Sequence, residues 1–144
     1  IDDIFEINTP LIGDFQIKNI LLAYAIIKEL GINTSNFIKY ISKVDIIPGR
    51  ANYFIKNEKH FIVDFAHTAP AIKTIVDFVK RQEFKKIYVV TGFGGNREVE
   101  KRIEMGRYLT DNCNFVIFTE DNNRNESFDN IMKDVQKEIS KSNE

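Results

Sequence analysis

Three short polar segments of the chain contain side chains that could bind a ligand or take part in chemistry. They cover residues 64–68, 92–98 and 120–126, and each directly follows a short apolar run. Short apolar runs bounded by polar residues are typical of buried strands, and open parallel sheets bind ligands beyond the carboxyl ends of their strands. We therefore take these three segments as the candidate functional site.

The middle segment is rich in glycine and precedes a predicted helix. Its sequence, GFGGNR at residues 92–97, combines backbone N–H groups with a helix N-terminus, and both favour an anionic ligand. The dinucleotide fingerprint G-x-G-x-x-G fails because Arg97 stands at the third glycine position, and the chain has no P-loop motif. Arg97, Lys101 and Arg102 put three cations in the first turns of the helix, so we expect an anionic partner for them.

The two outer segments combine carboxylate, imidazole and guanidinium groups. Asp64 ends a predicted strand and is placed to accept ribose hydroxyls, with His67 close by, although an ordinary turn would use the same residues. Arg124 carries a planar guanidinium that can hold a carboxylate through two parallel hydrogen bonds. A metal site at Asp121 and Glu126 is the weaker alternative for this segment, and a solvated loop is another.

The spacing of apolar residues predicts the elements that position these segments. Predicted helices cover residues 15–30, 36–43, 70–81, 98–111 and 127–140, and predicted strands cover 53–55, 61–63, 87–91 and 114–119. The expected fold class is α/β: a Rossmann-like, mostly parallel sheet with helices on both faces, preceded by a helical segment and a β-hairpin. The turn at Pro48 and Gly49 is the expected boundary between domains at 1–47 and 48–144.

Composition excludes several classes of protein. One Cys and two His cannot supply the four ligands of a structural zinc site built from Cys and His alone. A net charge of −1 argues against a general nucleic-acid or membrane-surface role, whereas a basic excess over residues 71–108 suits a small anion. The chain has neither an apolar run of about 20 residues nor a signal-peptide pattern, so the expected location is the cytoplasm.

In order and spacing, the motifs resemble those of the Mur ligase family along nearly the whole chain. GDFQIKN at 13–19 resembles the family's GxFNxxN, PGR at 48–50 resembles its inter-domain hinge, and DFAHT at 64–68 resembles DYAHT. GGNR at 94–97 resembles GGDR, KRIEMG at 101–106 matches KRxxMG, and TEDNNRNE at 119–126 resembles TxDNPRxE. The family members most similar in these motifs add the third amino acid to UDP-MurNAc-L-Ala-D-Glu.

The resemblance implies an ATP-dependent, amide-forming ligase of peptidoglycan precursor synthesis. ATP would phosphorylate the D-Glu carboxylate, and the amino group of a diamino acid would attack the resulting acyl phosphate. An Arg at position 124 resembles the enzymes that select meso-diaminopimelate, whereas an Ala there resembles those that select L-lysine. ATP and Mg²⁺ would be bound mainly by a central domain that lies outside these residues.

The same resemblance assigns binding roles to individual residues but places no catalytic residue in this chain. The residues expected to contact the nucleotide are Asn19 at the adenine, Arg50 and Asp64 at the phosphate and ribose side, and His67 near the phosphates. The residues expected to bind the incoming amino acid are Arg97, Asp121, Asn122 and Arg124. The chain departs from the family pattern at four positions: Gln16, Phe65, Asn96 and Asn123, the last of which replaces a proline.

The family's P-loop, magnesium ligands, UDP-sugar domain and late GxGHE segment have no counterpart in the sequence. We therefore expect an excised piece, comprising the end of the central domain and most of the C-terminal domain, that is inactive alone. An unpaired sheet edge would favour self-association. The alternatives are a ligase similar to folylpolyglutamate synthetase, a noncatalytic nucleotide-binding module of Rossmann-like fold, and an oxidoreductase with a nicotinamide cofactor.

Overall fold

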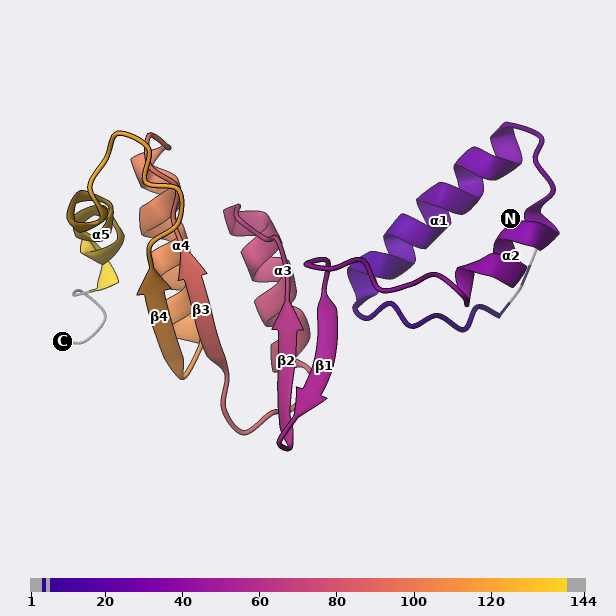
Figure 1. The fold of residues 1–144 in the computed structure, drawn as a ribbon, viewed down its shortest axis with the longest axis horizontal. Helices are drawn as coiled ribbons and strands as arrows, with labels where there is room; N and C mark the ends of the chain where they lie inside the picture. Colours follow the sequence, from indigo (N-terminus) through magenta and orange to yellow (C-terminus); the bar gives the residue numbers. More distant parts are fainter. Residues whose placement is uncertain (1–3, 5, 140–144) are drawn as a thin grey trace. The chain divides into compact units, whose positions relative to one another are not determined.

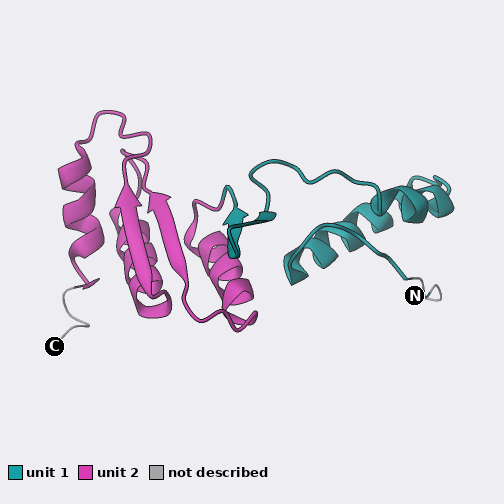
Figure 2. Ribbon diagram, turned by 60° about the horizontal axis from the view of Figure 1, so that its bottom comes forward, with its two compact units in different colours: residues 1–65 teal, residues 66–144 magenta. Residues whose placement is uncertain are grey.

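The computed structural model describes residues 4 and 6–139 and divides the chain into two compact units (Figure 2). The first unit comprises residues 1–65 and the second residues 66–144. The expected domain boundary at Pro48 stays a prediction, because division by compactness puts the β-hairpin with the first unit. No helix among the described residues is long and apolar enough to cross a membrane.

The described residues of the first unit form two helices and a hairpin. Helix α1 (Asp14–Glu29) packs against α2 (Thr34–Ile41), and the rings of Tyr24 and Phe37 lie 5.8 Å apart between their centroids. Glycine at position 31 permits the left-handed turn, with φ of 69°, that follows α1. Both helices begin and end close to their expected positions.

The hairpin joins β1 (Asn52–Lys56) to β2 (Lys59–Val63) in an antiparallel pair. Its two turn residues, Asn57 and Glu58, both have positive φ, at 49° and 60°. Two-residue hairpin turns of this kind match the right-handed twist of the strands they connect. The short polar stretch between two apolar runs therefore predicted this element correctly.

Among the described residues of the second unit there are two parallel strands and three helices (Figure 1). Strand β3 (Tyr88–Gly92) pairs with β4 (Phe115–Thr119), and Gly92 lies opposite Thr119 at the carboxyl ends. Helix α3 (Ala69–Lys80) precedes β3, α4 (Val99–Asn112) connects the two strands, and α5 (Phe128–Gln136) follows β4. Because paired parallel strands end side by side, the two segments that follow them leave the same edge of the sheet.

One apolar core joins the three helices of the second unit. Leu109 of α4 is fully buried, and Ile131 and Val135 of α5 are 1% and 0% exposed. A Cβ at Gly106 would lie 2.6 Å from Cγ1 of Val135, so the glycine is what permits the close packing of α4 and α5. This packing fixes the helices that carry the candidate loops.

The α/β class is confirmed, but within the described residues of the second unit the expected second helical layer is absent. All three helices share one core with the inward side chains of β3 and β4. The opposite face of this sheet exposes Tyr88, Val90, Phe115 and Ile117, which are 56–67% accessible. The strands are apolar on both faces, and that pattern predicted two-sided burial. The described parallel sheet has two strands, and the hairpin forms a sheet of its own.

Candidate functional site

The loops after β3 and β4 lie against each other in the second unit. The Gly95 N–H donates to the Asn122 carbonyl oxygen at 2.8 Å, and Nη1 of Arg124 donates to the Gly95 carbonyl oxygen at 2.7 Å. Gly95 thus contacts the facing loop through both of its backbone polar groups. The structure brings together two of the three segments singled out from the sequence.

The contact between these loops depends on the absence of side chains at two glycines. A Cβ at Gly95 would lie 1.8 Å from the Asn123 carbonyl oxygen, and a Cβ at Gly92 would lie 2.8 Å from Cβ of Asp121. At Gly94 the nearest heavy atoms would be 3.8 Å away, which is ordinary contact. Close backbone approach, rather than phosphate binding alone, therefore explains the glycines at 92 and 95.

Both loops contain a residue in the left-handed conformation. Asn96 has φ of 53° and Arg124 has φ of 51°. Asparagine tolerates this region, whereas a long side chain adopts it at a cost of order 1 kcal/mol and persists there only when its surroundings hold it. The hydrogen bond from Arg124 to Gly95 is one such constraint.

An ion pair with a buried cation and a partly exposed carboxylate lies beneath the two loops. Arg102 of α4 is 2% exposed, and its Nη1 and Nη2 donate to the two carboxylate oxygens of Glu126 at 2.7 and 2.6 Å. Nη2 also donates to the Gly94 carbonyl oxygen at 3.0 Å, and Nη1 donates to Asp134 of α5 at 3.2 Å. Glu126 Oε2 accepts a further bond, from the Asn96 N–H at 2.9 Å. Such two-pronged, charge-assisted pairs are the strong class of hydrogen bonds.

These contacts shift the protonation equilibria of both partners. The hydrogen bonds from Arg102, followed by the one from the Asn96 N–H, lower the pKa of Glu126 to about 2. The same hydrogen bond to Glu126 raises the pKa of Arg102 despite its burial. Glu126 is therefore ionised throughout the physiological range. The anionic partner expected for the cations of this helix is, for Arg102, a residue of the chain itself.

The side chains expected to bind an amino acid lie on the outside of this junction. Arg97, Asp121, Asn122 and Arg124 are all exposed. Within residues 4 and 6–139, the side chains of Arg97, Asp121 and Asn122 make no hydrogen bond or ion pair. Arg124 makes only the bond to Gly95. Guanidinium and amide donors are thus left available for a carboxylate-bearing ligand.

The residues expected near a nucleotide are divided between the units. In the first unit, Asn19 is exposed on α1, where its Nδ2 donates to Oε1 of Gln16 at 3.0 Å, and Arg50 lies 5.2 Å from the Phe65 ring centroid. Oδ2 of Asp64 accepts from the Ala51 N–H at 2.7 Å, which secures a left-handed turn at Ala51. His67, in the second unit, is exposed. Their roles toward a nucleotide stay predictions.

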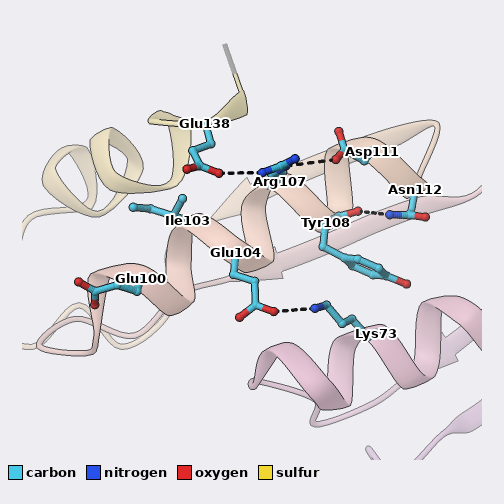
Figure 3. A pocket seen from close by; sticks show the side chains of 9 residues that line it. All are labelled: Lys73, Glu100, Ile103, Glu104, Arg107, Tyr108, Asp111, Asn112 and Glu138. Atoms are coloured by element: carbon cyan, nitrogen blue, oxygen red, sulfur yellow. Dashed lines mark hydrogen bonds and ion pairs between the residues drawn. The ribbon is translucent and has the colours of Figure 1, made fainter. Parts of the chain in front are cut away.

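A second group of charges lines a groove on the outer face of α4 (Figure 3). The groove has a volume of about 450 Å³ and lies between α3, α4 and Glu138 after α5. Its charges pair with one another: Lys73 with Glu104 at 2.6 Å, and Arg107 with Asp111 and Glu138 at 3.7 and 3.2 Å. It shares no residue with the loop junction. The groove is lined by two cations and four carboxylates, and its ion pairs are exposed, so the junction is the stronger candidate site for an anionic ligand.

Comparison with known proteins agrees with the motifs of the loop junction. Residues 49–144 match the protein family described as "Mur ligase, glutamate ligase domain". This chain belongs to the Mur ligase family. The matched region contains β1 and everything that follows it along the chain, including both loops of the junction.

Relatives of this Mur ligase chain carry one recurrent name. The UDP-N-acetylmuramoyl-L-alanyl-D-glutamate–2,6-diaminopimelate ligase of Lawsonia intracellularis is 35% identical over 135 residues, which is 93% of this chain and 28% of the relative. The ligase of the same name from Aquifex aeolicus is 34% identical over 136 residues, or 94% and 28%. The chain thus spans little more than a quarter of the length of these curated relatives.

Two solved structures have folds similar to that of this Mur ligase chain. A structure of a UDP-N-acetylmuramoyl-L-alanyl-D-glutamate–2,6-diaminopimelate ligase matches with a TM-score of 0.61 and 31% identity, covering 92% of this chain and 27% of that one. A pseudomurein peptide ligase type C from Methanothermus fervidus matches with a TM-score of 0.65, 99% and 33% coverage, and 19% identity. The second likeness concerns the fold alone.

Sequence reasoning missed how the Arg102–Glu126 pair organises the site. From the sequence, Arg102 had a role only as one of three helix cations and Glu126 only as a weak metal ligand, although both residues lie in the quoted family motifs. One signal could have paired them. The two residues carry opposite charges and lie in motifs that follow two neighbouring predicted strands, which are expected to end at the same edge of the sheet. Nothing in the sequence distinguished Arg102 as the buried cation of the three.

Proposed function

We propose that the chain is the amino-acid-binding part of an ATP-dependent ligase that joins meso-diaminopimelate to UDP-N-acetylmuramoyl-L-alanyl-D-glutamate. The observation that carries the proposal is the loop junction, which presents Arg97, Asn122 and Arg124 on the outside of a rigid ion pair. The names of the relatives support it.

In the proposed reaction, a D-glutamate carboxylate oxygen attacks the γ-phosphorus of ATP and displaces ADP. The amine of the diamino acid then attacks the acyl carbon, the C–N bond forms, and phosphate leaves as the nitrogen loses its proton. This chain contributes binding rather than bond-making: Arg97, Asp121, Asn122 and Arg124 would hold the carboxylates and ammonium of the diamino acid. Asp121 is the one acidic member and suits the ammonium.

ATP and Mg²⁺ would be held mainly by other parts of such a ligase. The sequence has no P-loop, and the part of the chain that the structure describes contains no cluster of three acidic, histidine or cysteine side chains. Asn19, Arg50, Asp64 and His67 are the residues of this chain that are proposed to contact the nucleotide. We therefore expect no ATP hydrolysis and no amide formation from these 144 residues alone.

Arg124 is proposed to select the diamino acid. meso-Diaminopimelate differs from L-lysine by one further carboxylate, and a guanidinium can hold that group through two hydrogen bonds. With one Nη already bonded to the Gly95 carbonyl, the guanidinium is held before the ligand arrives. A ligand that lacks the second carboxylate would leave this cation without its partner.

The test is phosphate release by a full-length ligase that carries this chain, with ATP, magnesium and the UDP-linked dipeptide. Separate reactions contain meso-diaminopimelate, L-lysine or no amino acid. Stimulation by meso-diaminopimelate alone is expected, and Arg124→Ala should raise its KM at least about tenfold. The matched control is Arg107→Ala, because Arg107 is an exposed arginine outside the loop junction that pairs with Asp111 and Glu138.

Other results would overturn parts of the proposal. Stimulation by L-lysine alone would keep the ligase and reject the selective role of Arg124. Stimulation only by a folate with glutamate would favour the folylpolyglutamate synthetase alternative. Lack of any turnover, together with nucleotide binding by this chain alone, would favour a noncatalytic binding module.

Two further expectations accompany the proposed function. The substrates are cytoplasmic nucleotide-linked precursors, so we propose a cytoplasmic location. The exposed apolar face of β3 and β4, with Tyr88 and Phe115 rings stacked 5.2 Å apart, supports self-association of the isolated chain. A single monomeric species in sedimentation at high concentration would contradict that expectation.

A further inference from the structure

The ion pair of Arg102 and Glu126 connects the first loop, the end of the second loop and α5. Arg102 reaches the Gly94 carbonyl on the first loop, Glu126 at the end of the second, and Asp134 on α5. Glu126 in turn accepts from the Asn96 N–H of the first loop. The pair therefore holds the first loop on both sides of Gly95.

Gly95 is the residue of the first loop to which the second loop is hydrogen-bonded. Its N–H binds the Asn122 carbonyl, and its carbonyl binds the Arg124 guanidinium. Arg124 is two residues from Glu126, so its left-handed backbone lies between two fixed points, Gly95 and the ion pair. Any displacement of Glu126 would move the backbone that sets the direction of the Arg124 side chain.

The ion pair is separated from the ligand-accessible groups. Arg102 is buried with 3% of its side chain accessible, whereas Arg97, Asn122 and Arg124 are exposed. It can therefore affect a ligand only through the loops. Buried apolar side chains would hold α4 against α5 equally well, but only a planar fork fixes the direction of several partners at once.

We propose that the Arg102–Glu126 pair is a positioning element that sets the affinity of the ligase for its diamino acid. The inference rests on the proposed function, because it names the ligand that the loops would bind. In this proposal the pair acts through the loops and not by contact with the diamino acid or the nucleotide. Their effect is to hold Asn122 and Arg124 where the carboxylates of the ligand arrive.

The functional test compares Glu126→Gln with wild type in the full-length ligase. Glutamine keeps the shape of the side chain but removes the charge and turns an NH₂ group toward the Arg102 donors. The expected result is at least a tenfold rise in the KM for meso-diaminopimelate, with the KM values for ATP and the UDP-linked dipeptide changed less than about twofold. Arg102→Lys, which keeps the charge but lacks the fork, should give a smaller rise.

A matched control separates the pair from the general charge of α4. Arg107→Gln removes an arginine from the same helix, where its side chain is 60% exposed, and should leave all three KM values unchanged. Equal rises in all three KM values for Glu126→Gln would indicate a general structural role and overturn the proposal. An unchanged KM for meso-diaminopimelate would do the same.

A second readout does not depend on catalysis. In the 144-residue chain, hydrogen exchange at the Gly95 amide should accelerate at least tenfold in Glu126→Gln, while the buried Leu109 amide on α4 keeps its protection. Unchanged exchange at Gly95 would overturn the positioning role. If Leu109 also lost protection, Glu126→Asp, which keeps the charge on a shorter side chain, would take the place of Glu126→Gln in both experiments.

The two proposals fail in different ways. If wild-type ligase turns over meso-diaminopimelate and Glu126→Gln does so with an unchanged KM, only the positioning role is lost. If wild-type ligase uses no diamino acid at all, the proposed function is overturned and the positioning role falls with it.

Discussion

Helix α4 contains two arginines that each pair with two carboxylates, one buried and the other exposed to solvent. Arg102 is 3% exposed at its side chain and binds Glu126 and Asp134 beneath the loop junction. Arg107, less than two turns further along the helix, is 60% exposed and pairs with Asp111 and Glu138 in the groove. The residue types are the same, and only the environment differs.

The environment decides what each cluster can do. Water screens the pairs of Arg107 and competes for their hydrogen bonds, so such contacts contribute little. Arg102 itself is shielded from water and its two bonds to Glu126 are 2.6 and 2.7 Å, so the loss of Glu126 would leave a buried cation with only Asp134 to balance it. The cluster around Arg102 holds two loops in place, whereas the cluster around Arg107 lies on the surface.

The largest expected effect comes from removing the two arginines in turn. Arg102→Ala should destabilise the second unit by about 3–4 kcal/mol, because the contacts of the buried guanidinium are lost and the partly exposed carboxylates of Glu126 and Asp134 lose their cation. Arg107→Ala should cost about 1 kcal/mol or less. Urea unfolding of the chain measures both changes. Equal losses in the two variants would show that burial does not distinguish the clusters.

The next effect concerns the backbone contact above the ion pair. Gly95→Ala should cost about 3 kcal/mol, because its Cβ would lie 1.8 Å from the Asn123 carbonyl oxygen and would force the loops apart. Gly94→Ala is the matched control, since its Cβ would have 3.8 Å to the nearest heavy atom. Thermal unfolding of the two variants gives the comparison. Similar midpoints for both would contradict the close approach of the loops.

The smallest expected effect is a dependence of stability on pH. The pKa of Glu126 is lowered to about 2 in the folded chain from an ordinary value of 4.5, so its stabilising contribution is fully present above pH 4.5. The contribution is lost as the pH falls from 4.5 toward 2. The difference in unfolding free energy between wild type and Glu126→Gln should therefore shrink over that range. A difference that stays constant would contradict the lowered pKa.

The elements themselves were largely predictable from the sequence. Helix α1 was expected from apolar residues spaced three and four apart, and the β1–β2 hairpin from two apolar runs around a polar turn. The parallel pairing of β3 with β4 followed from the helix between them. The prediction of a second helical layer was wrong for the described residues of the second unit. An apolar strand face shows that the face could be buried, but not whether another element covers it.

The candidate site was predictable only in part. Position in the chain was enough to expect the loops after β3 and β4 at one sheet edge, and the motifs named the family correctly. The binding roles of Arg97, Asp121, Asn122 and Arg124 stay predictions. The contact of Gly95 with Asn122 and Arg124 needed the coordinates, because it depends on the conformation of two irregular loops.

By itself, the sequence determined the order of helices and strands, the edge of the sheet where the loops gather and the family to which the chain belongs. These follow from periodicity, turn chemistry and motif spacing, which are local properties. Only the tertiary structure decided which of two arginines on α4 is buried and which residue is its anionic partner. That choice depends on which side chains the folded chain removes from water, and 24 positions separate Arg102 from Glu126 in sequence.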